Sequence, residues 1–198
     1  MAPMGTMIFS GGVERLKDCD YVVSSGFPLG YLLKDSRDRG YKQTFMDSGG
    51  VAAVLGWLLD NCGSAAMDGT LTTNSSPIWG EPFPIVDLAT KLLYRYRPGQ
   101  AEEIIHANSS YVGGCHQSVA IFQVLQAAIE EVGAENFDGQ AFYNAATRYR
   151  TSGPMWEGYP GWAFGETKRH LVDHCLIYEF DTAAQKLVRL SDWLPSTG

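Results

Sequence analysis

Short apolar runs alternate with amphipathic segments along the first third of the chain. Residues 21–25 and 43–46 are continuous β-prone runs. Between them, residues 28–40 carry apolar side chains at helical spacing and end on a glycine, which is typical of a helix terminus. A second helix is predicted over residues 51–59 and a third strand over residues 66–73. Strands and helices at this spacing predict βαβ units and a parallel sheet.

The middle of the chain is predicted to be helical. Apolar residues follow the i, i+3, i+4 pattern over residues 85–96. A longer helix is expected over residues 117–132, because its apolar positions lie mostly on one side and Gly133 follows them. Asp138 is expected to cap a further helix that continues to Tyr149.

The last fifty residues have a different character. Residues 151–166 are rich in glycine, proline and aromatic residues, which predicts a loop. Two β-prone runs follow over residues 171–180 and 186–193, and the five residues between them suit a hairpin. The predicted fold class is therefore α/β, with a parallel sheet and a C-terminal β-hairpin.

Composition describes a globular chain and narrows the classes of partner. The 198 residues are 45% hydrophobic and 19% charged, which fits one domain or at most two small ones. The net charge is −7, so we expect neither a nucleic-acid binder nor a polybasic membrane-surface protein. No apolar run approaches the ~20 residues that span a bilayer. Residues 1–10 lack a basic region, so the chain is expected to be cytosolic or a piece of an exported protein.

Common catalytic and metal-binding motifs are missing from the sequence. It has no phosphate-binding glycine loop, no nucleophile elbow and no CxxC pair, and its four cysteines are expected to be free thiols rather than two disulfides. Cys115 and His116 are adjacent, and neighbours on a helix point apart. His170 and His174 share one face of a predicted strand but lie ~13 Å apart along it. We therefore predict no metal and no cofactor.

Two polar loops follow the ends of the first two predicted strands. Ligands of open parallel sheets bind at the carboxyl ends of strands, where free backbone N–H groups and hydroxyls suit a polar or anionic group. Ordinary turn and capping roles are the alternative reading. The candidate ligand-binding residues in these loops are Ser25, Gly26, Phe27, Asp47, Ser48 and Gly49.

The aromatic loop is a third candidate site. Trp156, Tyr159 and Trp162 could line a ligand cleft. They could equally cover the edge of a hydrophobic core or a neighbouring domain.

The order of these elements resembles the second lobe of leucine/isoleucine/valine-binding-protein-like solute receptors. The shared pattern is a strand, a helix ending in Arg-x-x-Gly, and a strand ending in phenylalanine before a small loop. Later segments resemble the family's next strand, its helix ending in Ala-Ile-x-x-Ala-Gly, and its final hairpin. The residues that carry the resemblance are Asp20–Val23, Gly26–Pro28, Leu32–Met46, Asp68–Thr73, Gln117–Gly133 and Asp192–Trp193.

The resemblance implies the type I periplasmic-binding-protein fold, a Rossmann-like three-layer αβα parallel sheet. Family members are about twice this long, so the fold would be incomplete here. Residues 1–107 would form most of the second ligand-binding lobe. Residues 108–150 would be the helical segment that returns to the first lobe, and residues 151–198 a hinge-like aromatic loop and the C-terminal hairpin.

The resemblance also implies a function without catalysis or cofactors. The chain would be the extracytoplasmic solute-binding component of an ABC transporter, at the periplasmic or extracellular face of the membrane, and would deliver a small molecule to a permease. The glutamate of amino-acid-binding members falls on Gly49 here, so a carboxylate or aromatic ligand is as expected as an amino acid. Surface left by the absent lobe would favour self-association.

Two other functions stay open at this point. One is a ligand-sensing receptor domain of the same fold. The other is a small Rossmann-like enzyme, for which Asp47, Glu157 and His116 would be the candidate catalytic residues.

Overall fold

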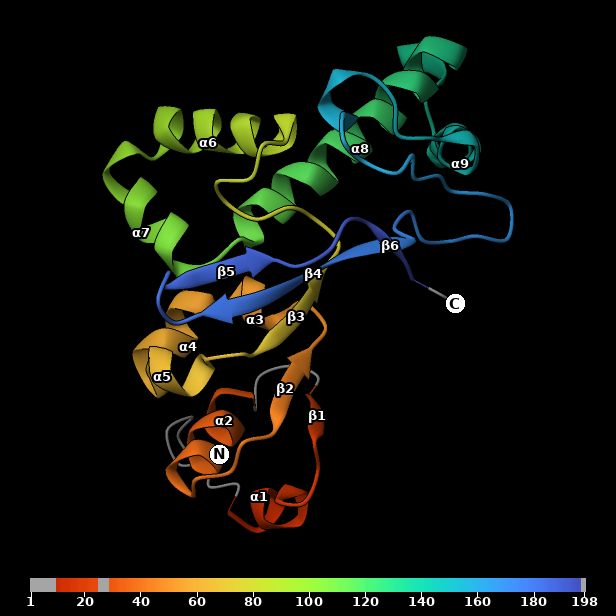
Figure 1. Cartoon of the computed structure of the whole chain (residues 1–198). Coiled ribbons are helices and arrows are strands. Elements are labelled where there is room, and N and C mark those ends of the chain that lie inside the picture. The colour runs from red at the N-terminus through yellow and green to blue at the C-terminus, as the bar shows by residue number, and fades with distance from the viewer. Residues whose placement is uncertain (1–9, 25–28, 197–198) are drawn as a thin grey trace, which may run out of the picture. The chain divides into compact units, whose positions relative to one another are not determined.

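The computed structural model describes residues 10–24 and 29–196, which fall into two compact units (Figure 1). Unit 1 holds the described residues up to Asn74, with Glu103–Ser109 and Leu176–Asp192. Unit 2 holds Ser75–Glu102, Ser110–Cys175 and the described residues from Trp193. The chain therefore passes between the units five times.

A mixed sheet forms the centre of unit 1. Its strands are β1 (Tyr21–Ser24), β2 (Thr44–Asp47), β3 (Leu71–Asn74), β4 (His174–Asp181) and β5 (Lys186–Arg189), side by side in that order. The first three are parallel, whereas β4 is antiparallel to both β3 and β5. The predicted parallel sheet is thus confirmed for its first part, and β4–β5 is the predicted hairpin (Figure 1).

Short helices connect these strands. They are α1 (Ser10–Leu16), α2 (Leu29–Asp38), α3 (Gly50–Ala53), α4 (Leu55–Cys62) and α5 (Ser64–Met67). The predicted helix over 51–59 is two helices, because Val54 has non-helical dihedral angles of φ −135° and ψ 33°. The predicted strand over 66–73 begins only at Leu71, since residues 64–67 are helical and Gly69 turns with φ 69°.

One face of the sheet supplies much of the core of unit 1. Leu176, Tyr178 and Phe180 alternate along β4 and are fully buried. On β1, Val22 is buried while Tyr21 and Val23, which point to the opposite face, are 65% and 77% exposed. This alternation is typical of a strand covered on one side only.

Unit 2 is mainly helical. The helix α6 (Pro84–Tyr96) confirms the predicted amphipathic segment, and α8 (Ser110–Val132) begins seven residues earlier than expected. The predicted cap of α9 (Gly139–Arg148) is confirmed, since Ala141 donates its backbone N–H to Asp138 Oδ1 over 2.8 Å. The aromatic loop contains one 3-10 turn, η4 (Pro154–Trp156). The remaining elements of unit 2 are η2 (Pro98–Gln100), η3 (Ala134–Asn136) and β6 (Leu194–Pro195), of which β6 pairs with the start of β4. The helix α7 (Ala101–Ala107) begins in unit 2 and belongs to unit 1 from Glu103.

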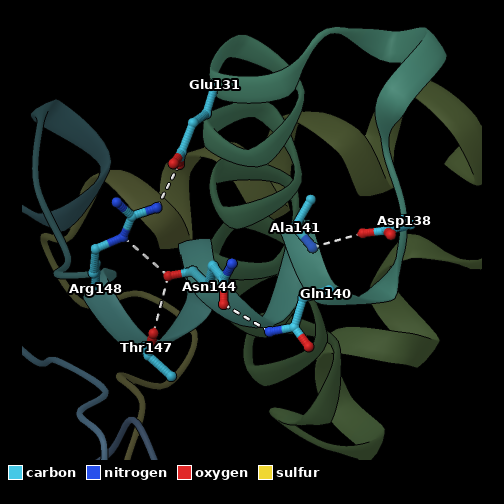
Figure 2. A network of polar contacts seen from close by, with 7 residues as sticks. All are labelled: Glu131, Asp138, Gln140, Ala141, Asn144, Thr147 and Arg148. Carbon is cyan, nitrogen blue, oxygen red and sulfur yellow. Dashed lines mark hydrogen bonds and ion pairs between the residues drawn. The ribbon is translucent and has the colours of Figure 1, made fainter.

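Polar contacts tie α9 to α8 and order its surface (Figure 2). Arg148 pairs with Glu131 of α8 and also donates to the carbonyl oxygen of Asn144. The amide of Gln140 donates to the Asn144 side chain one turn later. Of these exposed contacts only the Arg148–Glu131 pair joins α9 to α8, while the other two lie within α9, and each contributes little.

Two structural features are absent from the described residues. No described helix combines the length and apolar character needed to cross a bilayer. Within the same residues, no group of three or more His, Cys, Asp or Glu is placed to hold a metal ion.

Candidate functional site

Polar side chains line the carboxyl ends of the three parallel strands of unit 1. Ser24 lies opposite Asp47 in the β1–β2 pair, and Asp47 lies opposite Thr72 in the β2–β3 pair. All three are buried, with 8%, 4% and 1% of their surfaces exposed. Of these three residues, Asp47 is the one that the sequence predicted to lie beside a ligand at this edge.

The carboxylate of Asp47 accepts hydrogen bonds from groups within the protein. Its Oδ1 accepts a 2.6 Å hydrogen bond from the Thr72 hydroxyl and a 3.2 Å hydrogen bond from the backbone N–H of Val51. Gly50 is required beside it, because a Cβ at that position would collide with Asp47 Oδ2. The carboxylate therefore holds the turn that opens α3.

The turn that follows Asp47 exposes a hydroxyl group. Ser48 is exposed, and Gly49 adopts a left-handed φ of 96° at the start of α3. Ser25, Gly26 and Phe27, the other predicted members of this edge, lie outside the described residues. A small cavity of about 140 Å³ lies next to Asp47 and Gly50, lined otherwise by Leu29, Ala53, Val54, Trp57 and Leu58. The exposed hydroxyl and the turn backbone are what this edge can offer to a polar ligand.

The three predicted aromatic residues lie together around His116 in unit 2. The His116 ring centroid is 5.2 Å from that of Trp156, 5.5 Å from Tyr159 and 5.0 Å from Trp162. Trp156 and Trp162 are buried, and both belong to the hydrophobic cluster that α8 and α9 form with this loop. The loop thus covers a core, while a role in ligand contact stays a prediction.

The surroundings of His116 keep its imidazole neutral at pH 7. Burial lowers its pKa from 6.5 to about 4, and its Nε2 has no hydrogen-bond partner among the described residues. Burial also raises the pKa of the neighbouring Tyr159 hydroxyl above its usual range. Next to His116, burial raises the pKa of the Cys115 thiol, which disfavours the nucleophilic thiolate. This environment does not supply an activated nucleophile.

Sequence reasoning missed Gln123, which joins the loop to two helices. Its Oε1 accepts hydrogen bonds from the Tyr149 hydroxyl at 2.6 Å and from Trp156 Nε1 at 2.7 Å. Gln123 lies in α8, 26 and 33 residues from these partners in the sequence, so no local pattern could have indicated it.

Comparison with solved structures identifies the fold. A branched-chain amino acid ABC transporter protein from Thermus thermophilus, solved with bound valine, matches 97% of this chain with a TM-score of 0.76 and 18% identity. A fatty acid ABC transporter substrate-binding protein from Thermomonospora curvata matches 96% with a TM-score of 0.75 and 15% identity. The chain has the fold of ABC transporter substrate-binding proteins. A leucine-binding protein from Thermotoga maritima also has this substrate-binding-protein fold, with 94% coverage, a TM-score of 0.65 and 14% identity.

These matches cover only part of each solved structure. The chain spans about half the length of these structures, namely 50%, 48% and 49%. No family model matches the sequence, and no curated protein matches it either. The structural neighbours are binding proteins and receptors rather than enzymes. The predicted type I periplasmic-binding-protein fold is therefore confirmed.

Proposed function

We propose that this chain is the solute-binding component of an ABC transporter and holds a small molecule without transforming it. One observation carries the proposal: almost the whole chain follows the substrate-binding-protein fold, with a TM-score of 0.76 over 97% of its residues. Receptors of this kind work by differential affinity, because ligand contacts favour a closed conformation over an open one.

The proposed ligand is an amino acid or a related carboxylate or aromatic compound. The polar edge of unit 1 supports this class, since Ser48 is exposed there and the Gly49 turn opens α3. Asp47 is occupied by Thr72 and Val51, so its role is to position this turn rather than to pair with a ligand ammonium group. Trp156, Tyr159 and Trp162, together with residues 25–27, complete the proposed set of ligand-binding residues.

The proposal also includes a cellular location and partner proteins for this chain. A receptor of this function works at the periplasmic or extracellular face of a membrane and docks on an ABC permease. Exposed apolar side chains on α8, Ile121 at 56% and Phe122 at 66%, support the further proposal that the chain self-associates.

Calorimetric titration tests the proposal. We expect saturable binding of at least one member of a panel of valine, leucine, phenylalanine and benzoate. A ligand at 100 times its Kd should also stabilise the folded chain by about 2.7 kcal/mol. Ser48→Lys should weaken this binding at least tenfold because it places a long side chain at the turn.

Ser152→Lys is the matched control, since it adds the same side chain to an exposed serine in unit 2. It should bind as the wild type does. Absence of saturable heat with every member of the panel would contradict the proposed function.

A further inference from the structure

A mainly apolar cavity of about 300 Å³ lies within unit 2. Ligand pockets begin at about this volume, and because a dry cavity of ~150 Å³ accepts benzene, this one has room for two fused aromatic rings. Its wall includes Ala120 and Val124 of α8, Phe142 and Ala146 of α9, and Leu171 and Val172 of the loop before β4.

The cavity opens to solvent beside two residues of α8. Gln117 and Ile121 both line it and are exposed, Ile121 at 56%. A ligand could therefore reach the cavity from the surface of this helix.

The imidazole of His116 is the buried polar group in the cavity wall. His116 has only 4% of its surface exposed, and its Nε2 has no hydrogen-bond partner among the described residues. Burial lowers its pKa to about 4, so the ring is neutral at pH 7 and carries one donor and one acceptor nitrogen. Because buried polar groups are normally hydrogen-bonded, this ring is the part of the wall that would hold a polar group of a ligand.

Two further buried polar atoms belong to rings that surround His116. The Tyr159 hydroxyl and Trp162 Nε1 also lack hydrogen-bond partners within residues 10–24 and 29–196. The two ring centroids are 5.5 Å and 5.0 Å from that of His116, and 5.0 Å from each other. Burial keeps the Tyr159 hydroxyl protonated by raising its pKa, so all three rings are uncharged at pH 7. Their surroundings suit an uncharged polar group.

The cavity offers no charge of its own to a ligand. None of the described residues that line it is lysine, arginine, aspartate or glutamate. The Lys168–Asp173 ion pair contacts the wall, since Lys168 Nζ lies 3.4 Å from the Leu171 carbonyl oxygen, but its two charges compensate each other over 2.6 Å. A charged ligand group would thus lose its hydration without gaining a counter-ion, whereas a hydroxyl group loses much less.

We propose that this cavity binds an uncharged aromatic alcohol, with its rings between α8 and α9 and its hydroxyl group hydrogen-bonded to the imidazole of His116. The inference rests on the proposed function, because it selects the uncharged aromatic members of the proposed ligand class and uses the aromatic loop that surrounds His116. A neutral imidazole can accept the proton of an alcohol or donate its own, so either tautomer can make this bond.

Calorimetric titration of the whole chain with 2-naphthol tests this assignment, and 2-methylnaphthalene is the matched ligand because a methyl group replaces its hydroxyl. We expect saturable binding of both. His116→Leu should lower the affinity for naphthol about fivefold relative to methylnaphthalene, which is the net effect of about one hydrogen bond. The wild type should bind 2-naphthoate at least tenfold more weakly than naphthol, because a carboxylate would be buried without a counter-ion.

A measurement on the wild type covers the case in which His116→Leu does not fold. In protein labelled with ¹⁵N-histidine, 2-naphthol should shift the ring nitrogen resonances of His116 more than 2-methylnaphthalene does. The comparison separates a hydrogen bond from simple filling of the cavity, since both ligands fill it equally.

A further variant tests the cavity itself. Ala146→Leu fills space in the wall and should weaken naphthol and methylnaphthalene together by at least tenfold, while circular dichroism reports whether the fold is kept. Ala127→Leu makes the same change at an exposed alanine of α8 outside the lining, and should bind both ligands as the wild type does.

Titration of valine, leucine, phenylalanine and benzoate alongside distinguishes this inference from the proposed function. Binding of one of these four without binding of naphthol overturns the inference alone, whereas no binding of any ligand contradicts both. Two other results also overturn it: equal shifts of the His116 resonances with the two naphthalenes, or undiminished naphthol binding in a folded Ala146→Leu.

Discussion

The hydroxyl of Thr72 donates a 2.6 Å hydrogen bond to Oδ1 of Asp47, and this bond joins the carboxyl ends of β2 and β3. Both residues are buried, so the carboxylate depends on Thr72 and on the backbone N–H of Val51 for its polar contacts. The edge of the sheet is therefore held by an internal contact rather than left open.

Removing this hydroxyl should destabilise unit 1. Thr72→Val keeps the shape of the side chain but takes away one partner of a buried carboxylate, and we expect a loss of about 1–3 kcal/mol in the free energy of unfolding. Urea denaturation measures it. Thr73→Val is the matched control, because Thr73 is only partly buried and points to the other face of β3. Equal free energies for the two variants would refute the role given to Thr72.

Gln123 should be a strong determinant of the stability of unit 2. Gln123→Leu removes the acceptor of both Tyr149 and Trp156, and we expect a loss of about 2 kcal/mol because two partly buried donors then lack a partner. Gln126→Leu changes an exposed glutamine of the same helix and should stay within ~0.5 kcal/mol of the wild type. If both variants unfold at the same urea concentration, Gln123 does not link the loop to the helices.

His116 should make the protein less stable in acid. Because burial lowers its pKa to about 4, the unfolded chain, in which histidine titrates near 6.5, binds the proton first as the pH falls. Stability present above pH 6.5 is thus lost toward pH 4, and we expect His116 to account for about 2 kcal/mol between pH 7 and pH 5.

Urea denaturation at both pH values isolates this contribution. His116→Leu should flatten the pH dependence by that amount, since leucine does not titrate. A slope that is identical in His116→Leu and the wild type would contradict the prediction.

Two helical glycines should respond in opposite directions to alanine. A Cβ on Gly56 would lie 2.8 Å from both Ala107 Cα and His106 O, so Gly56→Ala should force α4 away from α7 and cost about 1–3 kcal/mol. A Cβ on Gly114 would meet nothing within 4 Å, and Gly114→Ala should stabilise α8 by about 0.5–1 kcal/mol. Thermal unfolding of the two variants checks the sign of each change.

Local patterns predicted much of the fold. Apolar spacing indicated α6, and the side chain of Asp138 caps α9 as expected. The pattern over 51–59 was continuous, yet the chain breaks at Val54, because helical periodicity does not reveal a single residue with non-helical dihedral angles. Strand direction was equally hidden, since the antiparallel pairing of β3 with β4 joins residues about 100 positions apart.

For the candidate sites too, the sequence predicted individual residues but not the contacts between them. The sequence placed Asp47 at a strand end, but only the structure reveals that Thr72 and Val51 occupy it. It singled out the aromatic loop, but not that His116 lies among its rings.

The five passages of the chain between the two units have a consequence for any attempt to divide this protein. Neither unit is a continuous stretch, so no truncation at one terminus removes one unit and spares the other. Expressing either alone would require new loops or a circular permutation that reconnects its segments. Heat should accordingly melt both in one cooperative step, with equal calorimetric and van't Hoff enthalpies.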